Sequence, residues 1–279
     1  MVWFLFALLG AFFSASRDAV MKGQLRRADS YVVSSGVFLG ASAVLFLVSA
    51  VNGFPALGSG FLTYLLAVAA FDLPSYVLFY KALKAADISL VAPMTSFELV
   101  FILFLSFAML GEAPTPLGLV GVLLILAGSF VINTDGRKAG NQDRVVFYVL
   151  IYAFIAALTA NLNKLLVQSS DAFFGSALLC LLLGSSFLTI ALAGRRGAKA
   201  AYRKGAHKFL AAGLLMALAI AAVNVAYTMQ IVPYVISLKR LSILFSVLYG
   251  GFLFKEKQIR RRLAGAALML AGTGLIIFF

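Results

Sequence analysis

The chain has 279 residues, of which 63% are hydrophobic and only 12% are charged, and its mean hydropathy is +1.03. A soluble protein of this size carries about 25% charged residues, so lipid is the expected solvent for most of the surface. A single cysteine and a single histidine exclude a disulfide framework, a cysteine metal site and a histidine-based catalytic or metal cluster.

Apolar runs of about 20 residues, the length of a helix that crosses a bilayer, recur along the whole chain. They predict an all-α membrane protein with ten transmembrane helices at residues 2–19, 31–51, 61–82, 88–110, 116–133, 145–166, 172–193, 209–231, 235–254 and 262–279. The first run has no basic segment before its apolar core, so we expect a retained span rather than a signal peptide. The connections are short, the longest being 134–144 and 194–208, so no inserted soluble domain is expected.

Lysine and arginine gather at one end of this predicted bundle. All but three of the 23 lie at the ends of, or between, helices 1–2, 3–4, 5–6, 7–8 and 9–10. The exceptions are Lys164 at the other end, and Lys239 and Arg240 inside the ninth helix. The positive-inside rule then places the basic loops in the cytoplasm and both termini outside, in a multi-pass protein of the cell (plasma) membrane. Because the charges are spread over five loops without interleaved aromatic residues, the net charge of +13 does not indicate a nucleic-acid partner.

Two segments of the chain align without a gap when the sequence is shifted by 144 residues. Residues 90–135 meet residues 234–279, so that Glu112 falls on Glu256, Gly121 on Gly265, and Gly128 on Gly272. Because five helices per copy is an odd number, the second copy must be inverted relative to the first. The prediction is two inverted five-helix repeats, 1–135 and 145–279, joined by a cytoplasmic linker, 136–144.

The most distinctive motifs lie around helices 4–5 and 9–10. They read LGEAPTPLGLVGVLLILAG in the first copy, and LKRLSILFSVLYGGFLFKEK followed by RLAGAALMLAGTGLII in the second. With five plus five helices in fewer than 300 residues, the chain resembles the ten-helix EamA-type transporters of the drug/metabolite transporter superfamily. The resemblance implies solute transport without a cofactor, often of amino acids, nucleotide sugars or phosphorylated sugars. Lys239 and Arg240 also resemble the Lys-Arg pair with which plastid phosphate translocators of this superfamily hold anions, whereas the first copy has Thr95 and Ser96 there.

Ionisable side chains inside a span are costly, so each is a functional candidate. Glu98 lies near the middle of helix 4, where we expect it to bind substrate or to couple transport to a proton. Asp72, in helix 3, is a second coupling candidate, because Pro74 removes a helix hydrogen bond and can open the backbone beside it. The alternative for Glu98 is a carboxylate that pairs with a buried donor and fixes helix packing. The alternative for Asp72 is a position nearer a helix end.

Lys239 and Arg240 put two positive charges into an otherwise apolar helix. Adjacent residues point about 100° apart on a helix, but both can line one broad cavity. The alternative is that they snorkel to the outer surface. With Glu98 on helix 4, the pair predicts a cavity that is cationic on one side and anionic on the other. It favours anionic or zwitterionic metabolites over hydrophobic cations, because a guanidinium suits carboxylate and phosphate.

Further polar residues recur in both halves and complete the expected substrate site. Ser14 and Asp18 are four residues apart and share a helix face, as do Thr159 and Asn163. The candidates for substrate binding are Lys239, Arg240, Glu98, Tyr80, Tyr227, Asn224, Asn163 and Asp18. The aromatic and amide residues can equally form hydrogen bonds between helices. The glycines of helices 5 and 10 are expected in close helix packing or in a dimer contact.

The sequence therefore predicts a secondary active transporter that moves a small organic metabolite across the cell membrane by alternating access. An anion or zwitterion is favoured, such as an amino acid or a phosphorylated or carboxylated compound. No enzyme activity, cofactor or metal is expected, and no phosphate-binding loop for ATP is found. The expected partners are the substrate, the bilayer and a proton or counter-substrate, in a monomer or homodimer. The alternatives are a proton-coupled exporter of cationic drugs, a lipid flippase of the same fold, or a membrane scaffold without transport activity.

Overall fold

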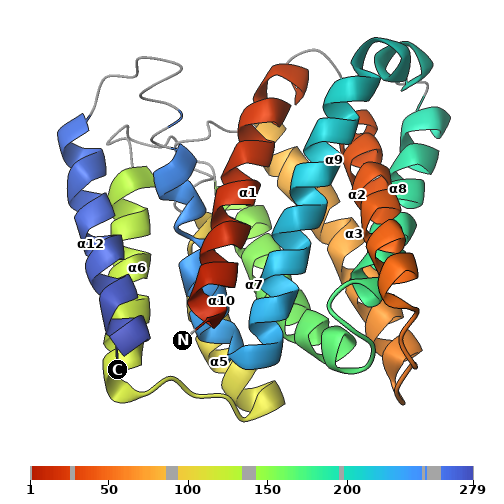
Figure 1. Cartoon of the computed structure of the whole chain (residues 1–279). Coiled ribbons are helices and arrows are strands. Elements are labelled where there is room, and N and C mark those ends of the chain that lie inside the picture. The colour runs from red at the N-terminus through yellow and green to blue at the C-terminus, as the bar shows by residue number, and fades with distance from the viewer. Residues whose placement is uncertain are drawn as a thin grey trace.

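The structure is a computed structural model that describes residues 2–25, 29–85, 94–133, 143–194, 198–246, 249 and 259–278 (Figure 1). These residues form ten helices with defined bounds and no strand, which confirms the all-α prediction. They are α1 (Trp3–Leu25), α2 (Ser30–Asn52), α3 (Phe61–Ala85), α5 (Glu98–Leu110), α6 (Pro116–Asn133), α7 (Asp143–Gln168), α8 (Phe174–Ala193), α9 (Ala198–Met229), α10 (Val232–Lys239) and α12 (Ile259–Phe278). Among the described residues, six helices are long and apolar enough to cross a membrane, and three shorter helices are also apolar.

The start of α1 and the end of α12 lie at the same end of the bundle, as an even number of spans requires (Figure 1). We call this the terminal end, and the other the opposite end. The connections 53–60, 111–115 and 169–173 also lie at the terminal end.

The packing partners of the helices are related by exchange of the two halves of the chain. Contacts join α1 with α9, α3 with α7, α2 with α8, and α6 with α12. In terms of the ten predicted spans, these are pairs 1–8, 3–6, 2–7 and 5–10. Exchanging spans 1–5 with spans 6–10 maps this set of pairs onto itself. Two inverted five-helix repeats produce this pattern.

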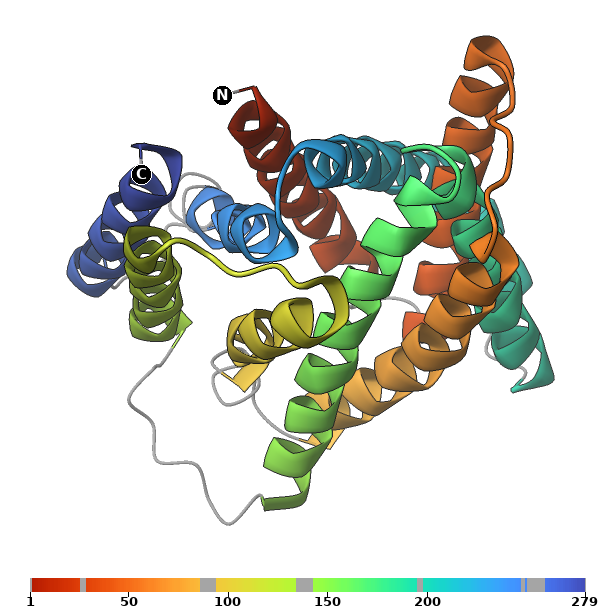
Figure 2. The ribbon, with the colours of Figure 1, turned by 90° about the horizontal axis from the view of Figure 1, so that it is seen from below.

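The α6–α12 contact shows the same relation at the level of single residues. A Cβ atom placed on Gly121 would lie 2.6 Å from the carbonyl oxygen of Gly272, and one on Gly128 would lie 2.5 Å from that of Gly265. The reciprocal contacts of Gly272 and Gly265 are as close. Gly121 therefore contacts Gly272, the repeat counterpart of Gly128, and Gly128 contacts Gly265, the repeat counterpart of Gly121. Such reciprocal contacts occur around a two-fold axis. The packing role expected for these glycines lies within the chain, and the two helices stand side by side in both views (Figures 1 and 2).

Two predicted helices are interrupted, which the apolar pattern did not indicate. In the predicted span 235–254, α10 ends at Lys239, a turn follows at residues 240–241, and helix resumes over 242–246. In the predicted span 88–110, a turn at residues 96–97 precedes α5. Residues 88–93, 247–248 and 250–254 of these spans lie outside the described residues.

The two interruptions have the same hydrogen bonds, shifted by 144 residues. Leu99 N–H donates to the Ser96 carbonyl at 3.1 Å, and Ile243 N–H donates to the Arg240 carbonyl at 3.0 Å. Two residues earlier the same bond joins Phe97 with Met94, and Leu241 with Leu238. Bonds from residue i to i−3 belong to tight 3₁₀ turns. Neither turn contains glycine or proline, so the usual sequence signals for a helix break are absent.

Two other expectations about the helices change. Most of the predicted loop 194–208 is helical, because α9 begins at Ala198. Pro74 lies inside α3, which runs without a break from Phe61 to Ala85, so the local opening expected beside Asp72 is not present. Pro233 is in the first turn of α10, where its missing N–H costs no helix hydrogen bond.

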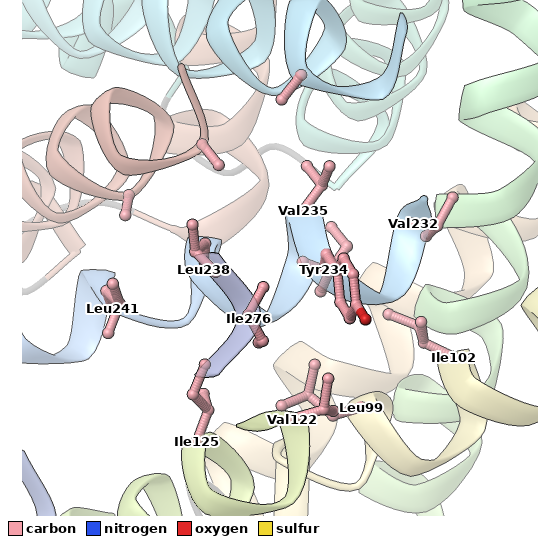
Figure 3. Packing of buried hydrophobic residues seen from close by; sticks show 14 of the residues in the cluster. Leu99, Ile102, Val122, Ile125, Val232, Tyr234, Val235, Leu238, Leu241 and Ile276 are labelled. Carbon is pink, nitrogen blue, oxygen red and sulfur yellow. The ribbon is translucent and has the colours of Figure 1, made fainter. Parts of the chain in front are cut away.

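The short helix α10 is enclosed by other helices. All residues from Val232 to Leu238 are buried. Figure 3 shows Val232, Tyr234, Val235 and Leu238 of α10 among Leu99 and Ile102 of α5, Val122 and Ile125 of α6, and Ile276 of α12. A second apolar cluster joins α2, α3, α8 and α9. The position of α10 is therefore fixed on several sides by apolar packing.

The glycine contact between α6 and α12 predicts an unequal effect of two alanine substitutions. Gly128→Ala should lower the free energy of unfolding by roughly 1–3 kcal/mol, because the added methyl group meets the Gly265 carbonyl oxygen and the Met269 N–H, which are backbone, as well as the Met269 side chain. Gly274→Ala, also on this helix pair, is the control, because nothing lies within 4 Å of its Cβ position. Thermal unfolding of the purified proteins measures both, and an equal loss in both variants would contradict the close contact.

Candidate functional site

The interruptions of the two helices bring an arginine and a glutamate together. Glu98 is the first residue of α5, and Arg240 directly follows α10. The Arg240 guanidinium forms an ion pair with the Glu98 carboxylate, and it also donates to the Thr95 carbonyl oxygen at 2.8 Å. A carboxylate at a helix N-terminus and a cation at a helix C-terminus are both stabilised by the helix dipole. This contact matches the alternative left open for Glu98, a carboxylate paired with a donor inside the bundle, although the sequence did not identify Arg240 as that donor.

Lys239 lies beside this pair but is not part of it. It is the last residue of α10 and keeps part of its surface accessible. Within the described part of the chain, it forms no hydrogen bond or ion pair. Its ammonium group is in the electrostatic field of Glu98, Arg17 and Asp18.

Asp72 on α3 is the nearby carboxylate that is not neutralised by an arginine. Its side chain is hydrogen-bonded with Thr159 of α7, and its charge interacts with those of Lys239 and Glu98. Asp72 and Lys239 thus present opposite charges from two helices. The sequence analysis noted Thr159 and Asp72 separately, but it did not predict that the two side chains meet.

Aromatic residues line the space between these charges. The ring of Tyr152 on α7 stacks on Phe79 of α3, with centroids 4.5 Å apart. Tyr152 lies in the field of Glu98, Arg240 and Asp72, and Tyr76 lies in the field of Asp72 and Arg17. Tyr76 and Tyr152 were not among the residues selected from the sequence, because tyrosines in apolar helices carry no distinctive pattern.

Arg17 and Asp18 on α1 form a second ion pair. The guanidinium of Arg17 donates to the Asp18 carboxylate from Nη2 at 2.8 Å and from Nε at 3.0 Å. The two side chains are 28% and 59% exposed. Arg17 was counted with the basic end of the bundle, but its charge interacts with Tyr76 and Tyr152. Its position within the expected span 2–19 was the signal that could have selected it.

We call these residues the central polar cluster: Arg17, Asp18, Asp72, Tyr76, Glu98, Tyr152, Lys239 and Arg240. Protein atoms surround Asp72, Tyr76, Tyr152 and Lys239, yet each of these side chains keeps part of its surface accessible. Polar groups inside a helical bundle that keep some accessible surface are candidates for contact with water or a ligand. The cluster can therefore meet water or a small molecule.

Four other residues expected in the site lie in helix packing or apart from the cluster. Asn224 is buried and donates to the Ala172 carbonyl and to Ser176 Oγ, both at 2.8 Å. Tyr227 is 4% exposed within the apolar cluster around α10. The hydroxyl groups of Tyr80 and Ser34 are hydrogen-bonded. Asn163 is partly buried on α7, and none of the contacts within the described residues joins it to the cluster.

The described residues include no group of three histidine, cysteine, aspartate or glutamate side chains that could hold a metal ion. The charged groups of the central polar cluster are instead paired, across helices for Arg240 with Glu98 and within α1 for Arg17 with Asp18, or keep part of their surface accessible, as Lys239 and Asp72 do. Such groups suit binding of a charged organic solute.

Interrupted helices and interior charges at the contact of two halves are recurring features of membrane transporters. Residues 1–134 match the EamA-like transporter family, which confirms the resemblance seen in the sequence. An uncharacterized transporter of Archaeoglobus fulgidus is 25% identical over 242 residues, which cover 85% of this chain and 84% of the relative. A solved crystal structure of a protein has the same fold, with a TM-score of 0.85 over 100% of this chain and 99% of its own at 14% identity. The family match and the name of the Archaeoglobus relative support a membrane transporter, while the solved structure shows the fold.

The ion pair between Glu98 and Arg240 predicts non-additive effects of substitution. Glu98→Gln or Arg240→Gln alone should lower the free energy of unfolding by about 3 kcal/mol, because each leaves one partly buried charge without its partner. The double variant should lose less than the sum, because both charges are removed together. Chemical unfolding of the four proteins in detergent measures the cycle, and additive losses would show that the two residues do not interact.

Proposed function

We propose that the protein is a secondary transporter that carries a small zwitterionic or anionic metabolite across the cell membrane by alternating access. The central polar cluster is its substrate site. One observation carries the proposal: Glu98 neutralises Arg240, while Lys239 and Asp72 lie nearby with opposite charges and no ion-pair partner among the described residues.

The cost of burying charge explains why this arrangement indicates binding. An ionisable group inside a membrane protein is stabilised by a partner, by water or by a ligand. Arg240 and Arg17 each have a carboxylate partner. Lys239 reaches an accessible space, where a ligand's anionic group can replace water around its ammonium. Asp72 has a hydroxyl neighbour, Thr159, and interacts with the charge of Lys239, but it forms no ion pair among the described residues.

A zwitterion such as an amino acid fits both charges at once. Its carboxylate would pair with Lys239 on α10, and its ammonium with Asp72 on α3. The rings of Tyr76 and Tyr152, which lie close to Asp72, offer π faces to the same ammonium. Asp72 takes the role that the sequence suggested for Glu98, because Glu98 is held by Arg240.

The same charges bear on the alternatives. A purely cationic drug would meet Lys239 without compensation, which disfavours an exporter of such compounds. A flippase could hold an anionic headgroup at Lys239, but the observations give no specific support for a lipid substrate. The distribution of lysine and arginine supports a cytoplasmic location for the opposite end, with both termini outside.

The substrate can be found by thermal shift and then tested by substitution. A library of metabolites is screened against the purified protein, since a ligand that binds only the folded state raises its unfolding temperature. Hits are tested for flux into proteoliposomes. Flux of a water-soluble solute supports the transporter, and movement of labelled lipid alone would indicate the flippase.

Lys239→Gln should weaken binding of a zwitterionic hit by about tenfold or more, because hydrogen bonds to charged groups contribute about 1.5–3 kcal/mol. Asp72→Asn should weaken the zwitterion similarly, but should leave the deaminated acid unaffected, since that compound lacks the ammonium group. Lys208→Gln is the control, because Lys208 is exposed and lies outside the cluster. Equal binding by all three variants and the native protein would contradict the proposed site.

A further inference from the structure

A third ion pair, mostly shielded from solvent, lies at the terminal end, outside the central polar cluster. Lys164 near the end of α7 and Glu112 in the 111–115 connection are 2.5 Å apart, Nζ to Oε1. Their side chains are only 8% and 13% exposed. The sequence showed Glu112 as a residue of the repeat and Lys164 as the lone cation of this end, but not that they meet.

Both residues also hold the turn from which α10 starts. Lys164 Nζ donates to the Gln230 carbonyl oxygen at 2.7 Å. The Val232 N–H, at the first position of α10, donates to Glu112 Oε2 at 2.8 Å. Both carboxylate oxygens of Glu112 are therefore engaged, one by a side chain and one by the α10 backbone.

A second contact ties α10 to the same connection. The Thr115 N–H donates to the hydroxyl oxygen of Tyr234 at 2.9 Å. The ring of Tyr234 stacks with Trp3 of α1, with centroids 6.3 Å apart. The terminal end is thus held together by α1 and the 111–115 connection from the first half of the chain, and by α7 and α10 from the second.

The helix α10 connects this network to the proposed substrate site. It has eight residues, with Val232 at the end bound by Glu112 and Lys239 at the other. A helix of this length is a rod of about 12 Å, so a displacement of its first turn moves its last turn as well. The position of Lys239 therefore depends on the state of the Glu112–Lys164 pair.

We propose that Glu112 and Lys164 form a latch that keeps the terminal end closed and positions Lys239 through α10. The latch rests on the proposed transport function, in which the site must open to each side of the membrane in turn. Opening the terminal end separates the 111–115 connection from α7 and from the α9–α10 turn, so the pair breaks. The ion pair is strong while both groups are shielded from water and weak once they are hydrated. This difference gives the two distinct states that a gate requires.

Accessibility of a single cysteine tests the latch without any ligand. Ser237 on α10 is the reporter position, because it is fully buried and its hydroxyl has no hydrogen-bond partner among the described residues. Ser237→Cys is combined with Cys180→Ala, which removes the native thiol. The rate of reaction with a membrane-impermeant methanethiosulfonate is measured separately on intact cells and on inside-out vesicles.

Lys164→Met and Glu112→Gln should each raise the labelling rate of the reporter by about tenfold or more from the terminal end only. Asp171→Asn is the matched control at the same end: Asp171 accepts hydrogen bonds from the Phe173 and Phe174 N–H groups, and asparagine preserves that cap. The control should label as slowly as the parent protein.

Two results would overturn the latch. One is an unchanged labelling rate in both variants, and the other is an equal rise from both sides, which indicates general loosening. The assay separates this proposal from the proposed function, because labelling can change in a protein that carries no tested metabolite. Binding of a zwitterionic hit adds a second readout: Lys164→Met should alter its affinity, although Lys164 lies outside the central polar cluster.

Discussion

The ion pair between Arg240 and Glu98 joins the two points at which helices stop inside the protein. An interrupted helix leaves backbone groups without their usual partners, and this is tolerated in a membrane protein only where other protein groups or water satisfy them. Here Arg240 donates to the Thr95 carbonyl oxygen as well as to Glu98. One guanidinium therefore satisfies a backbone acceptor and neutralises the carboxylate. The pair compensates the charges at the interruption and leaves Lys239 available beside it.

The two halves share their backbone geometry but not their chemistry. The same 3₁₀ hydrogen bonds occur at both interruptions, and the glycines of α6 and α12 meet reciprocally. The first half has Thr95 and Ser96 where the second has Lys239 and Arg240, and the second has Ser242 where the first has Glu98. The shared geometry agrees with two inverted repeats, while the differences at these positions leave Lys239 and Arg240 without charged counterparts in the first half. In the proposed site, Lys239 and Asp72 supply the two opposite charges.

Most of the fold could be predicted from the sequence. The lengths of the apolar runs give the number of helices, and the constant 144-residue shift between the two copies indicates the repeat. The interruptions could not, since Ser96, Phe97, Arg240 and Leu241 carry no helix-breaking signal, and tertiary packing decides their conformation. The interior charges Glu98, Asp72, Lys239 and Arg240 stand out in the sequence, but their pairing depends on which helices are neighbours. The amide of Asn224 donates to the Ala172 carbonyl and to Ser176 of α8, which is the interhelix alternative that the sequence left open.

The most direct test of the account is the charge preference of the native protein. Matched compounds are compared by thermal shift: an amino acid, its methyl ester, which is cationic, and its N-acetyl derivative, which is anionic. The account predicts the largest rise in unfolding temperature with the unmodified amino acid, a smaller rise with the N-acetyl compound and none with the ester. A rise with the ester equal to or above that of the parent amino acid would contradict a site built on Lys239 and Asp72.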